Sequence, residues 1–288
     1  MKLKEWLLIA LGSVPFIACP PAAAKAEDKI GDIISSYCNN VIENSMEKFV
    51  VEGNREEKTK MLVKELSECV EVPETHEELE NRLINEGYIY RQNIFGRITK
   101  PIRKVIDNKN QYDIIMYEPL TPIDNSLDNP NAFNLFGKIF VNDKTMKSLV
   151  DGIFELYKSK DLDFFPAKVN ARLYESMKGK NDEETRKNIY NNLIENYIQH
   201  EIEHIRNKDE TMNAPSEAKA YIGSFVRAPS YNVFMDLDYS IQVKDKNYGK
   251  AAERIFDLFE VHGISKEKIP EMSLEELKKT AEEIYKEL

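Results

Sequence analysis

One long segment, residues 183–208, constrains the fold of this chain more than any other part of the sequence. On a helix of about 100° per residue, its apolar side chains share one face that is roughly 180° wide. These side chains are Tyr190, Leu193, Ile194, Tyr197, Ile198, Ile202 and Ile205. The segment therefore predicts a long amphipathic helix with one buried side.

Two of the four histidines of the chain lie on this predicted helix. They stand in the sequence His200-Glu201-Ile202-Glu203-His204. Residues four apart share a helix face, so both imidazoles can bind one metal ion. In such an H-E-x-x-H pattern, the first glutamate reaches a zinc-bound water and acts on it as a general base. The pattern predicts a Zn²⁺ site with His200 and His204 as metal ligands and Glu201 as the catalytic residue.

The two glutamates of this pattern differ in their place on the helix. His200 and His204 lie at one edge of the apolar face, within about 40° of each other. Glu201 lies near the middle of that face, where an unpaired carboxylate is costly, so we expect it to have a partner at the metal site. Glu203 and Gln199 are expected on the polar side. The alternative for Glu201 is a charged residue tolerated on an exposed turn.

A third protein ligand is needed if one position of a four-coordinate zinc is to stay open. Glu217 follows His204 by 13 residues, beyond a loop long enough to reverse the chain, and lies at the start of the next predicted helix. Four small residues would let this helix approach the first one closely: Ala218, Ala220, Gly223 and Ser224. We expect Glu217 to be the third ligand. The alternatives are Asp209 or Glu210 as ligand, and an ordinary first-turn glutamate favoured by the helix dipole.

H-E-x-x-H followed by E-x-x-A on the next helix resembles the gluzincin type of zincin metallopeptidases. This resemblance implies that His200, His204 and Glu217 bind zinc and that Glu201 is the base in peptide hydrolysis. Tyr221 stands directly after the E-x-x-A segment. The prenyl-protein-processing and heat-shock membrane metallopeptidases, which this part of the chain resembles, usually have aspartate at that place.

A second segment extends the resemblance to residues 129–226. Its sequence N-A-F at 131–133, followed by G-K-I-F-V at 137–141, is similar to a segment of the prenyl-protein-processing and heat-shock membrane metallopeptidases. The resemblance implies that strand 138–141 is an edge strand of the active site, which pairs with an extended peptide. Four residues are candidates for stabilising an oxyanion, without a motif to support any of them: Tyr221, Arg227, Tyr231 and His262.

The first 26 residues have the three parts of a secretory signal peptide. Lys2 and Lys4 form a short basic start, and a mostly apolar run follows over residues 6–18. The sequence A-K-A at 24–26 then supplies small residues at the positions that signal peptidase reads. We therefore expect residues 1–26 to be removed.

An exported protein, secreted or held at the cell surface or in a periplasm, is the expected result. The mature chain would begin near Glu27, directly after the A-K-A sequence. The apolar run is short for a membrane span and is interrupted by Pro15, which argues against a retained span. A retained N-terminal anchor is one alternative. Lipid attachment at Cys19, after a segment that resembles a lipobox ending, is another.

Export changes what is expected of the cysteines, because disulfides form in oxidising compartments. Cys38 and Cys69 are equally distant from a predicted turn at residues 53–54, which joins predicted helices at 29–50 and 55–70. Positions equidistant from the turn of an antiparallel helical hairpin face each other, so we expect a disulfide. Two buried free thiols are the alternative.

The remaining elements predict a helix-dominated α+β fold. We expect an N-terminal helical subdomain at 27–95 and a zincin-like metallopeptidase domain with a small edge sheet at 96–288. Strand composition is found at 88–90, 114–117 and 138–141, and residues 231–245 alternate like a strand or hairpin arm. Further helices are predicted at 77–86, 145–159, 167–178, 216–226, 250–262 and 274–288.

Charge and hydropathy limit the function classes. The net charge of −10 and the isoelectric point near 5.2 argue against a broad nucleic-acid surface. No apolar run of 18 residues follows the N-terminal segment, so no membrane span is expected in the mature chain. We expect an exported zinc metalloendopeptidase, a hydrolase that acts on a protein or peptide substrate. The alternatives are an exported non-catalytic binding protein on the same scaffold and a helical surface protein without metal.

Overall fold

The computed structural model describes residues 84–85, 87–91, 94–99, 103–107, 110–119, 132–135, 137–158, 164–175, 177–208, 213–242 and 247–288. The predicted signal peptide, the helical hairpin with Cys38 and Cys69, and the alternative ligands Asp209 and Glu210 lie outside these residues. The described residues from 103 to 115 and from 132 onward belong to one compact unit, and those at 84–99 and 116–119 belong to a second.

The second unit contains an antiparallel hairpin of β1 (Tyr88–Arg91) and β2 (Ile94–Ile98). β2 also pairs with the last residues of β4 (Asn110–Pro119), where Ile98 lies opposite Tyr117. The sequence prediction of a strand at 88–90 is confirmed, whereas β2 was not predicted. The hairpin runs across residue 95, at which the sequence predicts a boundary between two domains.

The first unit contains two antiparallel hairpins. β3 (Arg103–Asp107) pairs with the first half of β4, and β5 (Ala132–Leu135) pairs with β6 (Lys138–Asn142). Gly137 has a φ of 71° in the tight turn between β5 and β6, a conformation that glycine adopts without strain. Phe133 and Phe140 face each other in register and stack with ring centroids 5.1 Å apart.

The expectation that residues 138–141 form an edge strand is wrong. Among the described strands, β6 lies between β4 and β5, and β5 stands at the end of the strand order. The physical reason is the tight turn at Gly137, which folds residues 132–135 back along β6 and makes them the outer strand.

Helices make up most of the described part of the first unit, so the predicted helix-dominated α+β class is confirmed at that level. They are α5 (Asp143–Lys158), α6 (Phe165–Glu175), α7 (Asp182–Asn207), α8 (Ala214–Arg227), α9 (Asn232–Gln242), α10 (Tyr248–Val261), η1 (Lys266–Glu271) and α11 (Leu274–Glu287). Ser273 and Glu276 form a capping box at the start of α11. Within the described residues, we find no helix with the length and apolarity needed to cross a membrane.

The prediction of a strand at 231–245 is wrong, because residues 232–242 form helix α9. Alternation of apolar residues favoured a strand, but the buried positions Val233, Phe234 and Leu237 lie on one face of a helix. The ring of Phe234 packs edge-on against Phe225 of α8 at 5.0 Å and Phe259 of α10 at 5.6 Å. Tertiary packing therefore decides the local conformation here.

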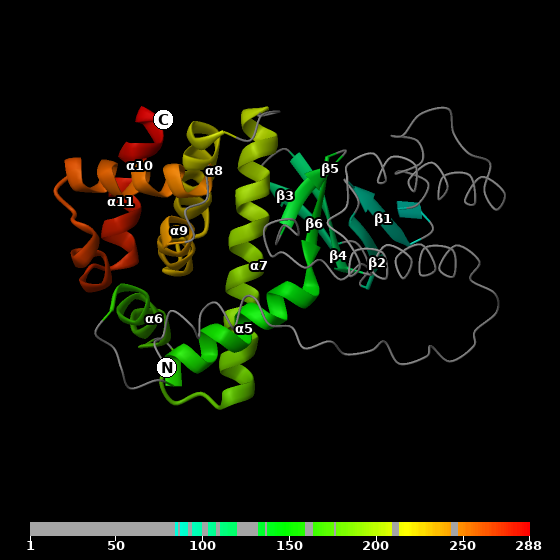
Figure 1. Ribbon diagram of the computed structural model, residues 1–288, viewed down its shortest axis with the longest axis horizontal. Coiled ribbons are helices and arrows are strands. Elements are labelled where there is room, and N and C mark those ends of the chain that lie inside the picture. Colours follow the sequence, from blue (N-terminus) through cyan, green and yellow to red (C-terminus); the bar gives the residue numbers. More distant parts are fainter. Residues whose placement is uncertain are drawn as a thin grey trace, which may run out of the picture. The chain divides into compact units, whose positions relative to one another are not determined.

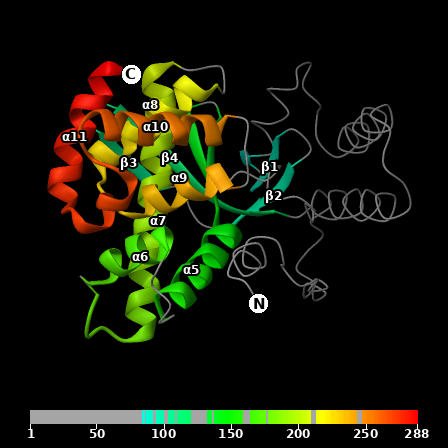
Figure 2. The same ribbon diagram turned by 60° about the vertical axis from the view of Figure 1, so that its left-hand side comes forward.

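Helix α7 is the central element of the first unit (Figures 1 and 2). It packs against β5 and β6 on one side and against α8 and α9 on the other, and it also contacts α5. α10 and α11 pack on α8. Asn181 caps its start by accepting a hydrogen bond from the backbone N–H of Glu184. At its end, Lys208 adopts a left-handed conformation with a φ of 53°. Because neighbouring elements cover α7 on both sides, buried residues occur on more than one face of the helix.

Candidate metal centre

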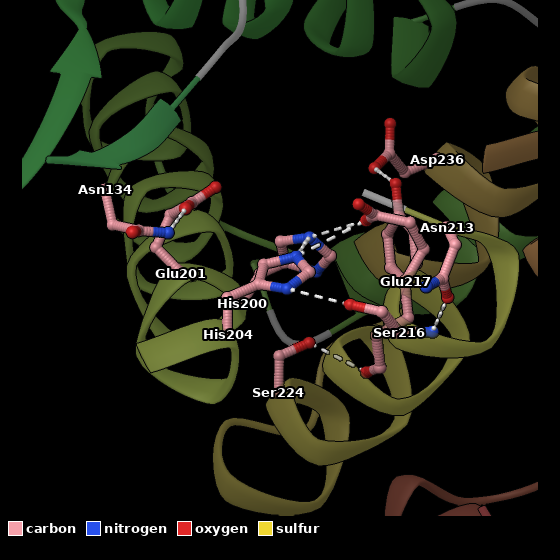
Figure 3. A network of polar contacts seen from close by, with 10 residues as sticks. Asn134, His200, Glu201, His204, Asn213, Ser216, Glu217, Ser224 and Asp236 are labelled. Carbon is pink, nitrogen blue, oxygen red and sulfur yellow. Dashed lines mark hydrogen bonds and ion pairs between the residues drawn. The ribbon is translucent and has the colours of Figure 1, made fainter. Parts of the chain in front are cut away.

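Two adjacent helices bring the predicted ligands together (Figure 3). α7 carries His200 and His204 one turn apart, and α8 carries Glu217 in its first turn. The side chain of Asn213 fixes the start of α8, since it accepts a hydrogen bond of 3.0 Å from the backbone N–H of Ser216. The carboxylate of Glu217 therefore faces the two imidazoles of α7.

The three ligand atoms form a compact triangle. The Nε2 atoms of His200 and His204 are 3.1 Å apart, and they lie 3.3 Å and 3.4 Å from Oε2 of Glu217. Ligands bonded to zinc at about 2.0–2.1 Å with tetrahedral angles lie about 3.3–3.4 Å from one another. The triangle thus has the size that a tetrahedral zinc site requires. The three residues could hold a metal ion.

The burial of Glu217 provides an independent test of this fit. Its side chain is 0% exposed, and both carboxylate oxygens lack a hydrogen-bond partner of good geometry within the described residues. An ionised carboxylate in such a place is costly unless a cation or donors compensate it. A metal ion among Glu217, His200 and His204 would supply the missing charge, so the donor set fits a bound cation.

The other nitrogen of each imidazole has a different environment. Nδ1 of His204 lies 3.4 Å from Oγ of Ser216, a contact that leaves Nε2 directed at the triangle. The ring of His200 packs against Tyr221 with centroids 4.6 Å apart, and Nδ1 of His200 has no hydrogen-bond partner in the described part. Tyr221 donates a hydrogen bond of 2.9 Å to Asp236 of α9. A carboxylate thus reaches this side of the site from a third helix.

The charges of the site stabilise one another in the metal-free protein. Burial disfavours ionisation of Glu217, but the contacts and charges of His200 and His204 outweigh it and lower the pKa of Glu217 to about 2. Burial likewise opposes protonation of His200, yet Glu217, Glu201 and Asp236 together raise the pKa of this histidine above its ordinary value. Glu217 therefore favours the protonated form of His200, and the two histidines favour the ionised form of Glu217.

Metal binding is consequently expected to compete with a proton on His200. Because the pKa of His200 is raised, a larger fraction of this histidine carries a proton as the pH falls, and the metal must displace that proton. Glu217 remains ionised over the same range, because its pKa lies near 2. The zinc dissociation constant should therefore rise as the pH falls, approaching about tenfold per pH unit for one displaced proton once the pH lies below the pKa of His200. Competition titrations between pH 8 and pH 6 measure it, and a constant that does not change with pH would contradict this expectation.

Glu201 has the buried environment that the sequence predicts, with 8% of its surface exposed. Its partner, however, comes from β5: the side-chain amide of Asn134 donates a hydrogen bond of 2.9 Å to Oε2 of Glu201. Oε1 has no protein partner within the described residues and is not among the polar atoms sealed from solvent. Asn134, which directly follows the N-A-F segment, was not predicted from the sequence to belong to the site. It is a polar residue in a short and otherwise apolar strand, and this pattern could have indicated a functional role.

Glu203 differs from the prediction, because its side chain is fully buried rather than on a polar side. It accepts hydrogen bonds from Arg206 at 2.5 Å and from Tyr285 of α11 at 2.7 Å, and it forms an ion pair with Arg227 of α8. Gly223 lies so close that a Cβ atom there would be 2.7 Å from Cγ of Glu203. Helices α8 and α11 cover this face of α7, so Glu203 joins three helices at one point.

The four oxyanion candidates have polar groups that are engaged elsewhere. Tyr231 donates to the carbonyl of Met272, His262 lies against Glu283 and Glu287, Arg227 pairs with Glu203, and Tyr221 donates to Asp236. Of these, Tyr221 contacts a predicted ligand, through its ring. None of the four presents a free donor to the triangle in the described part of the chain.

Comparison of the chain with protein-family models, with curated proteins and with solved structures found no match in any of the three. The interpretation of the site therefore depends on its own geometry. That geometry defines a helix-dominated α+β unit with a buried His-His-Glu group able to hold a metal ion.

Proposed function

We propose that this chain is an exported zinc metallopeptidase of the zincin, gluzincin-like class. The observation that carries the proposal is the convergence of His200, His204 and Glu217 beside a second acidic residue, Glu201. A purely structural metal site has no use for a general base in this position.

The donor set favours zinc over the hard cations. Two imidazole nitrogens and one carboxylate oxygen suit Zn²⁺, whereas Mg²⁺ and Ca²⁺ prefer oxygen ligands alone. Zinc supplies Lewis acidity, which polarises a carbonyl group and makes water acidic enough to lose a proton near neutral pH. His200, His204 and Glu217 would hold the ion, leaving one position open.

Glu201 would act as the base of peptide hydrolysis. Its Oε1 is reachable by solvent and has no protein partner in the described part, so it can take a proton from the attacking water and later give it to the leaving amine. β5, the last strand in the described order, lies beside Glu201 through Asn134. An extended peptide that runs along this end of the sheet would bring a carbonyl group to the base.

Export is supported by the basic, apolar and small-residue parts of residues 1–26. The secreted protein should begin at or near Glu27. In the exported protein, a disulfide should join Cys38 to Cys69, and non-reducing peptide mapping should detect it. Intact-mass analysis of secreted material tests the first expectation. A chain that still carries Met1 in the cytoplasm would contradict it.

A peptide-library assay on purified protein tests the activity itself. We expect cleavage that is abolished by a zinc chelator and restored when zinc is added back. Bound zinc without cleavage of any peptide would instead indicate the non-catalytic binding protein on the same scaffold. Cleavage that persists after complete removal of metal would contradict the proposal.

A further inference from the structure

We propose that Asn134 is a positioning residue that fixes the carboxylate of Glu201 for proton transfer; this inference depends on the proposed peptidase function. The two residues are 67 positions apart in the sequence and come from different elements, β5 and α7. Their hydrogen bond joins the edge of the sheet to the helix that carries two of the predicted metal ligands (Figure 3).

The chemistry of the two groups fixes the direction of this hydrogen bond. An ionised carboxylate has acceptor oxygens and no proton, so the amide nitrogen of Asn134 must be the donor. The Nδ2–Oε2 distance of 2.9 Å is that of a well-formed hydrogen bond. An amide neither gains nor loses a proton near neutral pH. Asn134 can therefore orient Glu201 without competing for the proton that the base transfers.

Engaging one oxygen leaves the other one for catalysis. Oε2 of Glu201 is held by Asn134, whereas Oε1 has no protein partner in the described part of the chain and stays in reach of solvent. The Glu201 side chain has several rotatable bonds, and without a second contact its carboxylate could turn away from the ligand triangle. A fixed orientation removes this freedom before the substrate binds, which is a recognised source of rate acceleration.

Packing of β5 against its neighbours holds Asn134 in place. Ala132 and Phe133, which precede Asn134 in β5, are buried, and Phe133 stacks on Phe140 of β6. α7 contacts both β5 and β6. Asn134 is thereby held at a fixed distance from Glu201 by packing that does not involve the metal ligands.

Replacing Asn134 with aspartate keeps the shape of the side chain, removes the N–H donor and places a second carboxylate against that of Glu201. We expect kcat to fall about 10- to 100-fold, the usual cost of losing a residue that orients a site, with KM within about twofold of the parent. Zinc content should be unchanged, because Asn134 is not one of the three proposed metal ligands. Asn191→Asp, the same change at an exposed position of α7, is the matched control and should leave kcat unaltered.

A double-mutant cycle separates positioning from a general structural effect. Glu201→Asp keeps a base but withdraws it by one methylene, so the contact with Asn134 is already lost. Asn134→Ala should then lower kcat about tenfold in the parent and less than about twofold in the Glu201→Asp background. The Ala variant also carries the test if Asn134→Asp fails to fold. Equal losses in both backgrounds, an unaltered kcat, or loss of zinc would overturn the inference.

The outcomes also separate this inference from the function on which it depends. A parent protein without zinc or without peptidase activity would contradict the proposed function. An active, zinc-loaded parent whose Asn134 variants keep the parental kcat would leave the function standing and refute the role of Asn134 alone.

Discussion

Replacing Glu201 with glutamine is expected to lower kcat by about 10²–10⁴-fold, the range typical for losing a general base, while the protein keeps its metal ion. Glutamine preserves the length of the side chain but cannot take a proton. It can still accept the hydrogen bond from Asn134 through its amide oxygen, so the local structure should persist. Steady-state kinetics and elemental analysis of the same preparation measure both parts of this expectation.

The matched control for this variant is Glu195→Gln. Glu195 lies on the same helix, half-buried, and pairs with Gln199 at 3.0 Å, away from the predicted ligands. This variant should keep the parental kcat and metal content. If Glu201→Gln retained full activity, Glu201 would not be the base, whatever metal the protein contained.

A second large effect is expected on stability rather than on chemistry. Replacing Glu203 with glutamine should lower the free energy of unfolding by about 2–3 kcal/mol, since it removes the charge that Arg206, Arg227 and Tyr285 share. The side chains of Arg206 and Arg227 are 17% and 37% exposed. Both guanidinium groups can therefore return partly to water, which keeps the loss below that of stranding a fully buried charge.

Urea denaturation followed by circular dichroism measures this loss. For a unit of this size, it corresponds to a melting temperature lower by about 5–10 °C. Glu195→Gln again serves as control, with an expected change below about 0.5 kcal/mol because its partner is a neutral side chain. A Glu203→Gln variant as stable as the parent would show that the contacts among α7, α8 and α11 at Glu203 do not hold the helices together.

The residues of the metal site could be predicted from sequence because their arrangement is mostly local. His200 and His204 are one helical turn apart, and this spacing alone places them on one face. Predicting Glu217 as a ligand required one further assumption. The chain had to reverse its direction after the first helix, and the small residues of the next helix had to allow the two helices to approach closely. The close approach at Gly223 bears out that step.

The environment of Glu203 could not be predicted in the same way. Analysis of a single helix assumes one covered face and one exposed face. α7 has the sheet on one side and α8, with α11 beyond it, on another, so a charged residue on the expected polar face becomes buried. The compensating groups come from other helices: Arg227 lies at the end of α8, and Tyr285 lies on α11, which follows much later in the sequence.

Contacts between elements also explain the errors at strand 138–141 and at α9. The short strand 132–135 is identified by its pairing with β6, and this pairing makes β5 rather than β6 the outer strand of the described sheet. Alternating apolar residues at 231–235 favoured a strand, but the aromatic packing of Phe234 between α8 and α10 stabilises a helix. A neighbouring strand joined by a tight turn decides the outcome at β5, and partners more distant in the sequence decide it at α9.

The metal content of the purified protein tests the central claim most directly. After zinc loading and dialysis, elemental analysis should give about one zinc ion per chain for the parent. His200→Ala, His204→Ala and Glu217→Ala should each retain far less, because each removes one of three protein ligands. Circular dichroism establishes that each variant is folded. A parent that retains no zinc, or folded variants that retain as much zinc as the parent, would contradict the assignment of this site.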